Sequence, residues 1–185
     1  MYTKIVCLAI VMCLISSISI CAEQDAENDK GFSGNVNFIF GSKTMSNAWD
    51  ESKTADAGIK LDFRHNSWPV YIACDLIGAG TLDETNAEWN IGARLYAKDR
   101  VGFNAFGGAG LTLIQASKGN LNFFGTSNSD DDKGTGYWVE FGFGYFGRKF
   151  NIGVDIVKSS ANVNLQGKNM NAGGLHASIL IGYRW

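Results

Sequence analysis

Apolar and polar residues alternate with a period of two along most of the chain from Phe32 onward. In the stretch 55–64, Ala57, Ile59 and Leu61 fall on one face, and Asp56 and Lys60 fall on the other. Such alternation is typical of a β-strand with two different faces. It recurs in segments 32–40, 55–64, 70–77, 87–96, 101–113, 137–146, 150–157 and 175–185. The 23 Gly residues also disfavour a helix bundle, so the pattern predicts an all-β fold.

The connections between these segments alternate in length. Short connections cover 65–69, 97–100 and 147–149, whereas longer ones cover 41–54, 78–86, 114–135 and 158–174. An even number of strands of about ten residues, with short turns at one end and long loops at the other, is typical of a membrane β-barrel. We therefore expect an eight-stranded antiparallel up-and-down transmembrane barrel over residues 32–185.

Alternation alone is compatible with two kinds of barrel. A membrane barrel turns its apolar face outward to lipid, whereas a lipocalin-like barrel turns it inward around a ligand. The lumen of an eight-stranded barrel holds little more than its own side chains, and here the polar face is rich in Gly while the apolar face carries the bulk. Charged residues also fall on the polar face, where acids and bases can neutralise one another. The predicted polar lumen network comprises Asp56, Lys60, Asp62, Arg64, Asp75, Glu88, Arg94, Glu140, Asp155, His176 and Arg184.

Aromatic residues gather near the ends of the predicted strands, as in the two girdles of membrane barrels. One group lies toward the short turns and comprises Phe63, Trp68, Tyr145, Phe150, Tyr183 and Trp185. The other group comprises Phe40, Trp89 and Tyr137. Both groups favour an apolar face that contacts lipid.

The first 22 residues are predicted to be a secretory signal peptide. Lys4 precedes an unbroken apolar run over 5–15, and small and polar residues follow up to Ala22. Cys21 would suit a lipoprotein anchor, but the bulky Ile20 before it disfavours that processing. Residues 23–31 are expected to be a polar lead-in. Cleavage leaves Cys74 alone, so neither an intramolecular disulfide nor a cysteine metal site is expected.

The last strand carries a family resemblance. Residues 175–185 alternate in apolar character and end in an aromatic, Trp185, two positions after Tyr183. The chain resembles the small eight-stranded outer-membrane barrels of Gram-negative bacteria, represented by the transmembrane domain of outer membrane protein A and its short relatives. The resemblance implies an outer-membrane location, contact with its lipid and lipopolysaccharide, and assembly by the barrel-assembly machinery. It makes Tyr183 and Trp185 the assembly signal, although Phe is the usual last residue.

Few residues suggest chemistry. His176-Ala177-Ser178 resembles the His-x-Ser pair of a lipid A deacylase. That pair faces lipid, however, whereas parity here turns His176 and Ser178 into the lumen, and Ile179 stands where that family tends to have Asn. Asp130–Asp132 could offer oxygens to a cation, but their spacing is not that of a calcium site. They are expected to form a solvated acidic loop. Asn122–Gly125 form an exposed apolar patch that could touch a partner.

The sequence thus favours a non-enzymatic, porin-like barrel of the cell envelope, with no catalytic residue, cofactor or metal. It would contribute to envelope integrity, or contact an extracellular partner that the sequence does not identify. The net charge of −2 disfavours nucleic acid as that partner. Two alternatives stay open: a lipid A-modifying enzyme at His176 and Ser178, and a narrow pore or carrier for small solutes.

Overall fold

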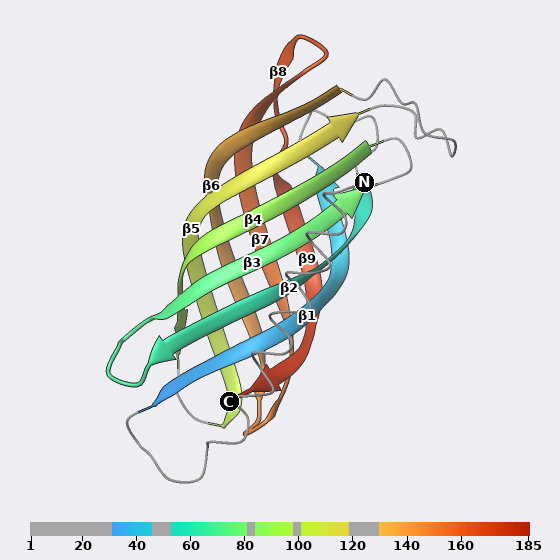
Figure 1. The fold of residues 1–185 in the computed structure, drawn as a ribbon. Helices are drawn as coiled ribbons and strands as arrows, with labels where there is room; N and C mark the ends of the chain where they lie inside the picture. The colour runs from blue at the N-terminus through green and yellow to red at the C-terminus, as the bar shows by residue number, and fades with distance from the viewer. Residues whose placement is uncertain (1–30, 46–52, 81–83, 98–100, 119–129) are drawn as a thin grey trace, which may run out of the picture.

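The computed structural model describes residues 31–45, 53–80, 84–97, 101–118 and 130–185. They form nine strands (Figure 1). The strands are β1 (Phe32–Met45), β2 (Lys53–His65), β3 (Tyr71–Gly80), β4 (Glu84–Tyr96), β5 (Gly102–Lys118), β6 (Asp130–Phe146), β7 (Phe150–Leu165), β8 (Lys168–Asn171) and β9 (Gly174–Arg184). No helix within these ranges is long and apolar enough to cross a membrane.

Eight of the strands close into an antiparallel barrel. Strands β1 to β7 each pair with the next, β7 also pairs with β9, and β9 pairs with β1 to complete the ring. The all-β fold with an eight-stranded antiparallel barrel is therefore confirmed. Closure leaves no free edge in the ring, which is the condition for strands to cross a bilayer.

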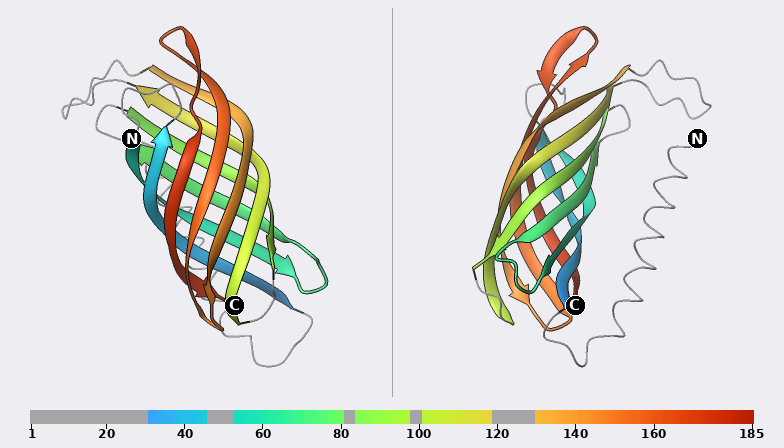
Figure 2. Two further views of the ribbon diagram at one scale, coloured as in Figure 1. Left: turned by 180° about the vertical axis from the view of Figure 1, so that it is seen from behind. Right: turned by 60° about the vertical axis from the view of Figure 1, so that its left-hand side comes forward.

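Strand β8 is the exception, because it pairs with β7 alone. The two strands form a hairpin that stands beyond the barrel rim (Figure 2). Its turn uses Gln166 with φ of 53° and Gly167 with φ of 72°. Two consecutive positive φ angles define a type I′ turn, whose twist matches that of the paired strands. We call this end of the barrel the hairpin end.

The opposite end carries the short turns, and we call it the short-turn end. Between β2 and β3 the N–H of Trp68 donates to the carbonyl of His65 at 2.8 Å. Between β6 and β7 the N–H of Gly147 donates to the carbonyl of Phe150 at 2.7 Å. In membrane barrels the short turns face the periplasm, so we expect the hairpin end to be the extracellular one.

The two faces of the barrel wall differ as the alternation predicts. Outward side chains are apolar and exposed, for example Ile91 at 63% and Phe141 at 64%. Inward neighbours such as Asn90 and Glu88 are fully buried. The molecule is therefore built inside out, with the apolar surface outside and the polar groups inside, and this excludes the lipocalin-like arrangement.

Several strands run further than predicted at the hairpin end. Strand β1 continues to Met45, β5 to Lys118 and β7 to Leu165, and β6 already begins at Asp130. The expectation that Asp130–Asp132 lie in a loop is therefore wrong. Beyond the membrane the outward face of a strand meets water instead of lipid, so its side chains become polar, while the backbone hydrogen bonds continue.

Some predicted features lie outside the described residues. They are the signal peptide over 1–22, the lead-in apart from Gly31, and the apolar patch Asn122–Gly125. These three interpretations stay predictions.

Candidate functional site

A cluster of ion pairs crosses the lumen in its short-turn half, centred on Arg94 of β4. Its guanidinium contacts Asp62 Oδ2 at 2.9 Å through Nη1 and Asp75 Oδ2 at 2.9 Å through Nη2, and its Nε contacts Glu140. Lys60 contacts Glu140 Oε2 at 2.8 Å and also Asp155. These side chains come from β2, β3, β4, β6 and β7. Buried charges require such pairing, because an isolated ion in the interior is very costly.

A second cluster lies nearer the hairpin end and centres on Glu88 of β4. Its carboxylate contacts Lys43 of β1, His176 Nε2 of β9 at 3.1 Å, and Ser159 Oγ of β7 at 3.1 Å. The other ring nitrogen of His176, Nδ1, contacts Asp56 Oδ2 of β2 at 2.7 Å. The two clusters together join all the barrel strands except β5.

Apolar side chains fill the lumen beyond the ion pairs. Near the short-turn end, the ring centroids of Tyr96 and Tyr71 are 5.0 Å apart, and those of Tyr96 and Phe146 are 5.1 Å apart. Trp138 is fully buried inside the barrel, and its Nε1 donates to the carbonyl of Ile91 at 3.4 Å. At the hairpin end, an aliphatic cluster comprises Ile114, Ala116, Ala161, Val163, Leu165 and Ala172.

No family model matches the chain, and no curated protein matches it. Solved structures do. Neisserial surface protein A aligns with a TM-score of 0.60 at 17% identity, over 85% of this chain and 98% of that one. Ail, the attachment invasion locus protein of Yersinia pestis, aligns with a TM-score of 0.54 at 14% identity, over 84% of this chain and 99% of that one. The fold is that of the small eight-stranded outer-membrane barrels.

The barrel encloses most of the residues that were predicted to line its lumen. Nine of them are buried and make the contacts of the two clusters: Asp56, Lys60, Asp62, Asp75, Glu88, Arg94, Glu140, Asp155 and His176. Arg64 and Arg184 differ, because both are only half-buried at the short-turn end. The guanidinium of Arg64 lies 4.7 Å from the ring centre of Tyr71 and donates to the carbonyl of Trp68 at 3.2 Å.

Lys43 is a charged residue of the lumen that the predicted network does not include. It is fully buried, contacts Glu88, and donates to Asn86 Oδ1 at 3.0 Å. It falls within the loop that was predicted over 41–54. The signal for it is parity, since Lys43 continues the inward series of Ile39 and Gly41, although Gly41 and Ser42 are residues that also favour a turn.

The His176 and Ser178 pair faces the lumen. His176 is 0% exposed and Ser178 is 5% exposed, and both ring nitrogens of the histidine contact carboxylates. The ring therefore serves as a cross-link between β2 and β4, and neither nitrogen is directed at Ser178. This geometry differs from the lipid-exposed pair of the enzyme that the motif resembles.

The acidic residues at the hairpin end are held within strands. The backbone N–H of Asn164 donates to Asp132 Oδ2 at 2.5 Å, and this bond lowers the pKa of Asp132. Across the described residues, no group of three or more His, Cys, Asp or Glu side chains is placed to hold a metal ion.

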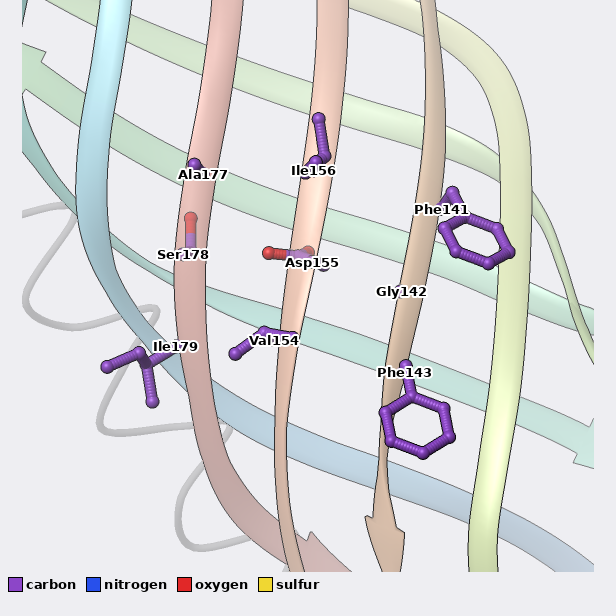
Figure 3. Close-up of a pocket in the computed structure, with 9 residues that line it drawn as sticks. All are labelled: Phe141, Gly142, Phe143, Val154, Asp155, Ile156, Ala177, Ser178 and Ile179. Atoms are coloured by element: carbon purple, nitrogen blue, oxygen red, sulfur yellow. The ribbon is translucent and has the colours of Figure 1, made fainter.

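Among the hollows of the lipid-facing wall are two shallow grooves. One, of about 430 Å³, lies over β6, β7 and β9, between Phe141 and Phe143 on one side and Ile179 on the other (Figure 3). The other, of about 690 Å³, lies over β1 to β5. We call the second the β2–β4 groove. Its apolar outward lining includes Phe38, Phe40, Ala57, Gly78, Ala87 and Trp89.

The β7–β8 hairpin presents amide side chains on one face. Asn162 is paired with Asn171, and Asn164 with Asn169, so all four lie on the same side of the hairpin. Asn171 is engaged locally, since its Oδ1 accepts from Gly173 N at 2.8 Å and its Nδ2 donates to Ser160 Oγ at 2.8 Å. Asn162, Asn164 and Asn169 are exposed.

Proposed function

We propose that this protein is a non-enzymatic outer-membrane barrel that supports the envelope and contacts an extracellular partner through its hairpin end. The observation that carries this proposal is the filled lumen. Two ionic clusters and the apolar groups around them join opposite walls along the barrel. Because the interior is occupied by these stabilising contacts, the surface at the hairpin end is the part of the barrel that is free to bind a partner.

The hairpin supports a contact role because it is structured. A type I′ turn and paired Asn residues hold β8 on β7, and the bond from Asn164 to Asp132 ties the hairpin to β6. A pre-ordered surface loses little conformational entropy when it binds. Its exposed groups are amides, which donate and accept hydrogen bonds.

Ail has been solved with sucrose octasulfate, a heparin analogue. A sulfated ligand calls for a cluster of cations. The hairpin face carries amides instead, so we expect a neutral polar partner, such as the hydroxyl groups of a glycan.

The two alternatives receive less support. An acyl hydrolase needs a histidine within reach of the membrane lipid, and His176 is buried and bonded to two carboxylates. A pore needs an open path, and the side chains named above occupy the lumen.

The test compares the purified barrel with a triple variant, Asn162→Ala, Asn164→Ala and Asn169→Ala, on an array of neutral and sulfated glycans. The double variant Ser42→Ala and Thr44→Ala, on β1 near the same end, is the control. We expect the triple variant to lose binding to a neutral glycan at least tenfold and the control to keep it. Equal binding by all three proteins would refute the hairpin role.

Planar-bilayer recordings test the filled lumen separately. The wild-type barrel should give no stable conductance steps. Large, ion-selective steps would replace the proposal with the pore alternative.

A further inference from the structure

The β2–β4 groove is a depression in the wall at a place where large side chains are missing. Ala57, Gly78 and Ala87 stand side by side on β2, β3 and β4. Phe40 borders this row on β1, and the next rung toward the membrane centre carries Ile59, Leu76 and Trp89. Small residues between large ones create the groove of about 690 Å³, which lies within the usual size range of small-molecule sites.

The level of the groove in the membrane follows from its neighbours. Phe40 and Trp89 belong to the aromatic girdle at the hairpin end, and both are exposed on the outer wall. Aromatic girdles mark the boundary between the hydrocarbon core and the headgroups. The row of small residues therefore lies within this girdle, where the acyl chains of the outer leaflet meet its headgroups.

A cation stands above the groove on the same strand face. Lys53, Ala55 and Ala57 alternate outward along β2, and Lys53 is exposed. An ammonium at the headgroup level attracts phosphate. The wall thus offers an apolar trough below and a positive charge above, which complements an anionic lipid.

We propose that the β2–β4 groove binds one acyl chain of a phosphorylated outer-leaflet lipid, and that Lys53 contacts its phosphate. An unfilled apolar depression in a bilayer loses dispersion contacts, and a flexible chain can follow its concave shape. This site is independent of the partner surface proposed for the hairpin end, so either can fail alone.

Native mass spectrometry of the intact barrel, with lipid A and with phosphatidylethanolamine as probes, tests the site. Gly78→Leu fills the groove without strain, because a Cβ at Gly78 meets only Ala57 O, at 3.8 Å. Gly107→Leu is the matched control: it also points outward, lies elsewhere on the wall, and meets only Glu140 O, at 3.4 Å.

Wild type and Gly107→Leu should retain one lipid A, and Gly78→Leu should reduce its occupancy at least tenfold. Lys53→Gln should reduce lipid A occupancy several-fold and phosphatidylethanolamine occupancy less, because lipid A carries a net negative charge and phosphatidylethanolamine does not. Equal lipid A retention by Gly78→Leu and wild type would overturn the site. A wild-type dimer that Gly78→Leu dissociates would overturn it too, since the occupant would then be a second copy.

Discussion

Glu140 is the residue at which the two cations of the short-turn cluster meet. Its Oε2 contacts Lys60 of β2, and its Oε1 contacts Arg94 of β4. Both bases therefore share one carboxylate. A carboxylate shared in this way couples two strands that are not neighbours in the ring.

We predict that Glu140→Gln and Lys60→Met are not additive in a double-mutant cycle. Their coupling should be about 0.5–3 kcal/mol, because each change removes a partner of the other. Urea unfolding in lipid vesicles, followed by tryptophan fluorescence, measures it. Lys43→Met is the control, since Lys43 belongs to the Glu88 cluster, and its effect should add to that of Glu140→Gln within about 0.5 kcal/mol. If the effects of Glu140→Gln and Lys60→Met also add, water screens the charges of Glu140 and Lys60 from each other.

Ile91 reports on the outer wall. It points outward from β4 and is 63% exposed. Ile91→Arg should destabilise the barrel in vesicles by about 2–4 kcal/mol, because a charge on the lipid face near the midplane is costly. Ile91→Leu keeps the apolar surface and should change the unfolding free energy little. If the two variants unfold alike, Ile91 does not face lipid.

Among the elements, the β7–β8 hairpin is the one that can change without the barrel. Gly167 has a φ of 72°, which is costly for other residues. Gly167→Val should therefore weaken the hairpin by about 1–2 kcal/mol. Amide hydrogen exchange should accelerate over Lys168–Asn171, while the exchange of β1 to β5 stays unchanged because β8 pairs only with β7. Global acceleration would show that the hairpin is part of the barrel's cooperative unit.

Strand β9 closes the ring, and its end is the predicted assembly signal. The N–H of Trp185 donates to Gly34 O at 3.1 Å, and its ring packs so closely over Gly34 that a Cβ there would lie 2.5 Å from it. We predict that Trp185→Asp lowers the amount of folded barrel in the outer membrane, whereas Trp185→Phe is nearly silent. The heat-modifiable band on unboiled gels measures folded barrel. Normal assembly of the Asp variant would remove the signal role.

The strands within the bilayer could be predicted because lipid outside and a crowded lumen inside impose opposite demands on successive residues. Residues 55–64 and 87–96 show this contrast over their full length. Their extensions could not be predicted in the same way. Beyond the membrane, Lys43 and Asp132 continue the strands through backbone pairing, which has no signature in side-chain hydropathy.

The lumen could be predicted as a set of residues but not as a set of contacts. Parity places Glu88 and His176 inside, yet their sequence numbers do not indicate that they meet. The contact depends on the register and stagger of the strands around the ring. Parity also did not separate Arg64 and Arg184 at the short-turn end from the residues within.

On the scale of the whole molecule, Cys74 offers a test of the inside-out arrangement. It lies on the outer wall of β3, beside Leu61 and Ile91. In the refolded chain 23–185 it is the single thiol. A water-soluble maleimide should label Cys74 slowly in vesicles and quickly in urea. A lipid-soluble maleimide should label it quickly under both conditions. Fast labelling of the folded barrel by the water-soluble reagent would place β3 outside the lipid.

The pairing of β1 with β9 brings the two ends of the ring together. Gly34 and Trp185 exchange two backbone hydrogen bonds, of 3.0 and 3.1 Å, so both ends of the ring meet at the short-turn end. A short linker could join them, and the chain could be cut instead at a connection on the hairpin side. Such a circular permutant would keep every strand pair while losing its terminal aromatic. It should refold unaided in detergent yet fail to assemble in cells, and it would thereby separate what the barrel needs to be stable from what it needs to be delivered.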